Sequence, residues 1–193
     1  MFKIEIEGKT ILHTGDFRAH GYTGYLLEKV LRYYVKQVDI LITEGTMLGR
    51  KNEVVLLEAD IEKNVAEALR KSKYVYALCS STDIDRLRAL HNACKATGRT
   101  FVCDRYQYSV LDIFNKYTLS ERYKFNRVFK LINYKTKNVF QKLLHTGFLV
   151  MVRPSSYSRI KRMMRTYNDQ PSALIYSMWQ GYHNGTQEQI NED

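Results

Sequence analysis

The sequence has few prolines and cysteines, and its apolar runs are short. Only two prolines and three cysteines occur in 193 residues. The cysteines form no C-x-x-C pair, and their odd number argues against a disulfide framework. No apolar run approaches the ~20 residues that span a bilayer, and the N-terminus lacks the charged-then-apolar order of a signal peptide. We therefore expect an intracellular protein, cytoplasmic or nuclear, with no membrane partner.

The composition favours a folded, globular chain. Hydrophobic residues make up 45% of the sequence, charged residues 26% and aromatic residues 12%. These fractions are typical of folded domains rather than disordered ones, and a chain of this length can bury one sizeable core or two modest ones. We interpret Cys79, Cys94 and Cys103 as reduced thiols within the core.

Acidic residues are almost absent from one segment. Residues 116–165 contain 13 Lys and Arg against one acid, Glu121, so the segment carries an excess of 12 positive charges. Because the whole chain carries +10, the remainder carries about −2. Seven aromatic residues are interleaved with this charge: Tyr117, Tyr123, Phe125, Phe129, Tyr134, Phe140 and Tyr157. Such a mixture suits RNA or DNA, through phosphate neutralisation and base stacking. The alternative is a solvated basic surface whose aromatic residues belong to the core.

Apolar periodicity predicts an α/β fold. Short apolar runs typical of buried strands occur at Val75–Leu78, Phe101–Cys103, Leu149–Val152 and Leu174–Tyr176. Stretches with helical spacing lie between them. This alternation favours a mainly parallel sheet covered by helices on both faces.

The first fifty residues follow a different pattern. They predict a hairpin in which Phe2, Ile4 and Ile6 share one face and Gly8-Lys9 form the turn. A helical stretch over residues 24–37 and a buried strand within residues 38–44 come next. We therefore expect a boundary near Arg50–Lys51, with residues 1–50 and 51–193 as separate parts.

Several stretches together resemble a known superfamily of hydrolases. "HTGDFR", followed by a helix and "DILITEGT", resembles the metallo-β-lactamase superfamily. "YVYALCSSTDIDRL", "FVCDRYQ" and "ALIYSMWQGY" are similar to its β-CASP branch. That branch includes the endonucleases of messenger 3′-end formation, the J-type ribonucleases and DNA-repair nucleases. The resemblance implies a partial metallo-β-lactamase-like domain over residues 1–50 and a β-CASP-like cap domain over 51–193.

The resemblance also assigns roles to two carboxylates. Asp16 in "HTGDF" matches the acidic ligand that bridges two metal ions, normally zinc. Glu44 in "ITEGT" matches the first acidic motif of the branch, a catalytic position that orients a histidine near the leaving group. A bridging carboxylate fixes the spacing of two cations that activate water and neutralise a phosphate. The alternatives are an aspartate that caps the next segment and a glutamate that faces solvent.

The histidines depart from the family's pattern. The signature H-x-H-x-D-H belongs upstream of the hairpin, and two late histidines belong downstream of "SMWQGY". The five histidines of this chain reproduce neither set: His13, His20, His91, His145 and His183. Because a catalytic zinc takes three or more protein ligands, we expect an inactive fragment without zinc. The two zinc ions would belong to its full-length parent.

Two further groups are candidates for substrate binding. Ser80, Ser81 and Thr82 follow a predicted strand and precede a helix, where hydroxyls and backbone N–H groups can hold a phosphate or simply cap the helix. The second group consists of basic residues that follow the strand at 149–152: Arg153, Arg159, Lys161, Arg162 and Arg165. Asp104 also ends a strand, where capping or pairing with an arginine such as Arg105 is the expected role.

Three function classes remain open. The first is part of a metal-dependent phosphodiesterase, a nuclease that acts on RNA or DNA. The second is a metallo-hydrolase of a small ester or amide substrate. The third is a non-catalytic nucleic-acid-binding module. The basic segment favours the first and third classes over the second.

Overall fold

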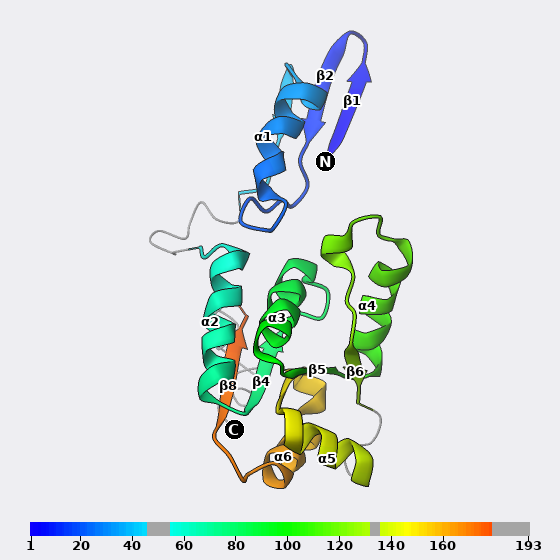
Figure 1. Cartoon of the computed structure of the whole chain (residues 1–193). Coiled ribbons are helices and arrows are strands. Elements are labelled where there is room, and N and C mark those ends of the chain that lie inside the picture. The colour runs from blue at the N-terminus through cyan, green and yellow to red at the C-terminus, as the bar shows by residue number, and fades with distance from the viewer. Residues whose placement is uncertain (46–54, 132–135, 179–193) are drawn as a thin grey trace. The chain divides into compact units, whose positions relative to one another are not determined.

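The computed structural model describes residues 1–45, 55–131 and 136–178, and these fall into two units (Figure 1). One unit comprises Met1–Asp60 and the other Ile61–Asp193. The boundary expected at Arg50–Lys51 lies outside the described residues. Within the described residues, no helix is both long and apolar enough to cross a bilayer.

The first unit is built on a three-stranded sheet. Strands β1 (Phe2–Ile6) and β2 (Lys9–His13) form the predicted antiparallel hairpin, and β3 (Ile40–Ile42) pairs in parallel with β2. The turn is Glu7–Gly8 rather than Gly8–Lys9. Both turn residues have positive φ, 49° and 69°, which is the backbone that a two-residue hairpin turn of type I′ requires.

The helical stretch of the first unit is irregular. It consists of a 3₁₀ turn at Gly24–Leu26, α1 at Leu27–Val30 and a π turn at Leu31–Val35. Among the residues of these three turns, only Val35 is buried. The apolar face predicted for β1 is also exposed, with Phe2 at 70% of its full accessibility. The hairpin face shared by Phe2, Ile4 and Ile6 therefore adds little to a core within this unit.

The second unit is built on a parallel five-stranded sheet in the order β6-β5-β7-β4-β8. Its strands are β4 (Tyr74–Cys79), β5 (Thr100–Cys103), β6 (Val128–Lys130), β7 (Phe148–Val152) and β8 (Ser172–Ser177). Every pairing in it is parallel. The predicted α/β class with a mainly parallel sheet is confirmed, and all four predicted strands are present. Strand β6 was not predicted.

Two strands that were predicted to be buried are not: β3 of the first unit, whose three residues are all exposed, and β8 of the second. All six residues of β4 are buried, whereas β8 has only exposed and partly exposed residues, with Leu174 at 58%. The described strands place β8 at an edge, paired with β4 alone. An edge strand keeps one side open to solvent, so an apolar sequence does not ensure its burial.

Helices cover both faces of this sheet and form a core on each (Figure 1). One face holds α2 (Glu58–Lys71), α3 (Ile84–Thr97) and α4 (Arg105–Tyr117), and the other holds α5 (Lys137–Thr146) and α6 (Tyr157–Thr166). Side chains alternate along β4, so that Val75 and Ala77 join the first core while Tyr74 and Tyr76 join the second.

None of the three cysteines forms a disulfide and all three are buried, as the sequence predicted. Cys79, Cys94 and Cys103 all pack in the core on the α2–α4 face. Burial raises the pKa of the Cys94 thiol and raises that of Cys103 to about 12. Both are therefore protonated and weakly nucleophilic at neutral pH.

Gly147 sets the start of β7 and offers a test of the fold. It follows α5 with φ of 65°, and a Cβ there would lie 2.5 Å from the Lys73 carbonyl oxygen. Gly98 ends α3 with φ of 68° but has open space around it. We expect Gly98→Ala to lower the free energy of unfolding by about 1–2 kcal/mol and Gly147→Ala by a further ~1–3 kcal/mol. Urea denaturation measures both; equal losses would contradict the close approach.

Candidate functional site

The structure brings the loops of Asp16 and Glu44 together. Both loops leave the carboxyl ends of neighbouring parallel strands, β2 and β3. The N–H of Thr14 donates to the carbonyl of Ile42 at 2.9 Å, which extends the pairing past the strands. The N–H of Phe17 donates to Oε1 of Glu44 at 2.8 Å. Since Asp16 immediately precedes Phe17, the two predicted site carboxylates belong to one loop cluster.

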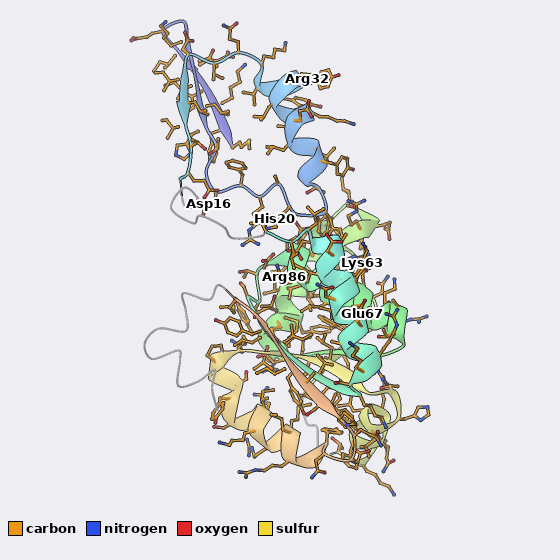
Figure 2. The ribbon with its side chains drawn as sticks, turned by 90° about the vertical axis from the view of Figure 1, so that its left-hand side faces the viewer. Asp16, His20, Arg32, Lys63, Glu67 and Arg86 are labelled. Carbon is orange, nitrogen blue, oxygen red and sulfur yellow. The ribbon has the colours of Figure 1, made fainter. Side chains whose placement is uncertain are left out.

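Asp16 is exposed at this end of the three-stranded sheet, away from the hairpin turn (Figure 2). His20 lies further along the same loop, and its backbone carbonyl accepts a hydrogen bond from the N–H of Glu58 at 3.2 Å. His13 uses Nδ1 to accept from the N–H of Gly15 at 3.1 Å. These histidine contacts shape the loop.

The described residues do not by themselves fit a zinc centre. Among them there is no group of three or more His, Cys, Asp and Glu side chains that could hold a metal ion. Asp16 and Glu44 supply two carboxylates where a zinc site takes three or four ligands. The metal role of Asp16 and the catalytic role of Glu44 remain predictions.

The second unit has its own cluster of polar residues, at the carboxyl edge of the parallel sheet. Ser80–Thr82 follow β4, Asp104 follows β5, and Arg153 follows β7. Strands β4 and β7 are neighbours, yet α3 leaves β4 for one face and α6 leaves β7 for the other. In parallel α/β proteins, ligands commonly bind at the strand ends where neighbouring connections leave for opposite faces.

Asp104 both caps a helix and forms an ion pair at this edge. Its Oδ1 accepts from the N–H of Gln107 at 2.9 Å, and Oε1 of Gln107 accepts from the N–H of Asp104 at 3.0 Å, which forms a capping box at the start of α4. Oδ2 accepts from Nε of Arg153 at 2.9 Å and also from its Nη2. The predicted capping role is confirmed, but the arginine partner is Arg153 rather than Arg105.

Arg153 is held in place by more than this ion pair. Its guanidinium lies over the ring of Tyr106, 5.0 Å from the centroid. Its side chain keeps 31% of its accessibility while Asp104 keeps 10%. Nε and Nη2 are directed to the carboxylate, so Nη1 is the group that remains for another acceptor. The predicted substrate-binding residue is thus oriented at the strand ends.

The serine and threonine hydroxyls after β4 do not cap α3. The N-cap is Asp83, whose side chain accepts from the N–H of Arg86 at 3.4 Å. Ser80 and Thr82 are exposed and their hydroxyl oxygens lie 3.1 Å apart. Ser81 is 8% exposed, and its hydroxyl is buried without a hydrogen-bond partner. The capping alternative is therefore wrong for these three residues.

The remaining basic candidates lie on α6. Ile160 and Met163 are buried against the sheet, while the outer surface of the helix carries the exposed residues Arg159, Lys161, Arg162 and Arg165. The helix begins at the carboxyl end of β7 and runs towards the start of β8. Arg165 therefore lies about 9 Å further along the helix axis than Arg159. Arg159 is therefore nearer to the end of β7 than Arg165 is, and the substrate-binding role of these residues remains a prediction.

His91, on α3, belongs to the core. It is 1% exposed, its Nε2 lies 2.7 Å from the carbonyl oxygen of Asn126, and its ring packs against Phe101 and Phe125. Burial lowers the pKa of His91, so the ring is neutral at physiological pH.

In comparisons of the sequence, no protein-family model and no curated protein matches the chain.

The double role of Asp104 can be separated by two substitutions. We expect Asp104→Ala to lower the free energy of unfolding by about 2–3 kcal/mol, since it removes both a helix cap and the partner of Arg153. Asp104→Asn keeps the cap, because asparagine caps helices as well as aspartate does, and should cost less. Urea denaturation of both variants measures the difference. Equal losses would mean that the cap contributes nothing.

Proposed function

We propose that this chain forms part of a zinc-dependent nuclease of the β-CASP branch, and that its second unit binds the phosphate backbone of RNA or DNA. One observation carries the nucleic-acid part: helices α5 and α6 cover one face of the sheet and contain no Asp or Glu. The exposed charged residues of these two helices are therefore lysines and arginines, and the one acid that an observed contact places on this face is Asp169, whose Oδ1 accepts from the hydroxyl of Tyr74 at 2.7 Å.

The two faces of the sheet differ in charge. Helices α2, α3 and α4 on the other face carry acids among their exposed and partly exposed residues, such as Glu67, Asp85 and Asp112. On the basic face, Lys137 and Lys142 of α5 are exposed, as are four cations of α6. In the sequence no acid occurs between Glu121 and Asp169. A surface of one sign concentrates an anionic polymer and speeds its association.

The catalytic part of the proposal concerns Asp16 and Glu44. We assign to Asp16 the role of a metal-bridging ligand and to Glu44 that of orienting a catalytic histidine. The hydrogen bond from the N–H of Phe17 to Glu44 supports this assignment, because it holds the two loops together at the ends of parallel strands. The remaining ligands must come from residues other than the described ones.

Zinc titration tests the metal assignment. We expect the chain alone to lack a stoichiometric zinc site of sub-micromolar affinity, because two carboxylates are too few ligands. In a complete enzyme that contains this chain, Asp16→Ala should lose zinc and phosphodiesterase activity together. Isothermal calorimetry and metal analysis measure these outcomes. Full activity of that variant would refute the assignment of Asp16.

Salt-dependent binding tests the nucleic-acid assignment. We expect a labelled single-stranded oligonucleotide to bind weakly at low salt, with Arg159→Ala/Arg162→Ala reducing the slope of log K against log salt by about 1.4, or about 0.7 per lost phosphate contact. Fluorescence anisotropy across a salt series measures the slope.

The matched control is Arg70→Ala/Lys71→Ala, which removes two exposed cations from α2 on the opposite face. That variant should keep the slope of the unmodified chain. No binding at low salt, or equal slopes in all three proteins, would defeat the nucleic-acid proposal and favour a hydrolase of small substrates.

A further inference from the structure

The carboxyl edge of the five-stranded sheet contains buried hydrogen-bond donors that have no acceptor. Gln107 is fully buried, and its Nε2 has no hydrogen-bond partner. Its Oε1 is fixed on the N–H of Asp104, so Nε2 must lie at the same end of α4. Ser81, in the turn between β4 and α3, is the second such donor. Native proteins rarely leave buried donors unpaired, and a missing ligand is one explanation for such a group.

The sheet register places these two junctions on either side of Arg153. Leu78 of β4 pairs with Val152 of β7, so Arg153 emerges beside the end of β4. Val102 of β5 pairs with Val150 of β7, which places Asp104 beside the end of β7 on its other side. Since neighbouring strands lie about 4.8 Å apart, the junctions of Ser81 and Gln107 are separated by about two strand spacings.

We propose that this edge is a phosphate-binding site formed by Ser81, Gln107 and Arg153. All three side chains offer donors: a hydroxyl, an amide N–H₂ and Nη1 of a guanidinium. At neutral pH the oxygens of a phosphate act almost entirely as hydrogen-bond acceptors. The planar array of donors on an arginine matches them. The N-termini of α3 and α4 flank the site and add a favourable dipole.

Two acids near the site limit its strength. Asp104 is neutralised by Arg153, whereas Asp83 is occupied as the N-cap of α3. Asp83 keeps its negative charge as a cap, so these three charged residues supply no net positive charge, and recognition depends on hydrogen bonds to the phosphate oxygens rather than on bulk attraction. This distinguishes it from the exposed cations of α6, which attract phosphate without geometric preference.

Phosphate binding here follows from the geometry of the second unit alone. That the phosphate belongs to a nucleic acid, rather than to a free phosphate compound, rests on the function proposed above. The two sources share one chemistry and can be distinguished by the choice of probe.

Inorganic phosphate is the first probe, titrated into ¹⁵N-labelled chain at constant ionic strength with chloride as the reference anion. We expect the side-chain amide resonances of Gln107 to shift with phosphate and not with chloride. Ser81→Ala should raise the dissociation constant about tenfold or more, because it removes one hydrogen bond to a charged group. It should not lower the urea midpoint, since the hydroxyl has no partner in the protein.

Two further variants keep the test decisive. Gln107→Glu preserves an acceptor for the N–H of Asp104 and so the capping box, but it replaces the donor with a negative charge and should abolish phosphate binding. Ser172→Ala, an exposed serine at the opposite end of β8, should change neither binding nor stability. Unchanged phosphate affinity in Ser81→Ala and Gln107→Glu would overturn the site and leave binding to surface cations only.

A single-stranded oligonucleotide is the second probe. If Ser81→Ala weakens both phosphate and oligonucleotide, the site holds a backbone phosphate. If it weakens inorganic phosphate alone, the site stands but its assignment to nucleic acid is wrong. If the unmodified chain binds phosphate at this site and no oligonucleotide at low salt, the proposed function fails while the phosphate site remains.

Discussion

The parallel pairing of β4 with both β7 and β8 is the constraint on which the second unit depends. A parallel strand cannot return by a tight turn, so each neighbour is reached through a crossover helix. The helices then lie on both faces and bury every residue of β4. The same constraint brings the carboxyl ends of all five strands to one edge, where Ser81, Asp104 and Arg153 gather. The arrangement of polar groups is thus a consequence of strand direction.

Much of this architecture could be predicted because it rests on local patterns. Continuous apolar runs identified the strands at 75–78, 101–103 and 149–152. Strand β6 escaped prediction because it has three residues, all partly buried, within a strongly basic stretch. The exposure of β8 was also not predicted, because the position of a strand within a sheet depends on the fold and not on the strand's own sequence.

The candidate sites show the same division between local and long-range information. That Asp104 caps a helix follows from its place before a helical stretch, but its ion pair with Arg153 spans 49 positions in the chain. The contact between the loops of Asp16 and Glu44 spans 27 positions. The unpaired hydroxyl of Ser81 has no signature in the sequence, since only packing determines whether a turn serine meets water or protein. The sequence identifies which residue types stand at the ends of the strands, whereas the partners of those residues can be identified only from the folded structure.

The two units reach different degrees of burial. The second unit packs two apolar cores, one on each face of its sheet, whereas β1 and β3 of the first unit consist entirely of exposed residues. A three-stranded sheet with one short irregular helix has too little surface in contact to bury its apolar side chains. Most of the stabilisation of the described residues therefore comes from the second unit.

The buried thiols of Cys79, Cys94 and Cys103 have a practical consequence. A maleimide dye reacts with exposed thiolates, and these three side chains offer neither exposure nor, for Cys94 and Cys103, an accessible thiolate at neutral pH. A single cysteine introduced on the surface of either unit can be labelled selectively in the native chain. Pairs of such labels would report the separation of the two units by energy transfer, without replacement of any natural cysteine.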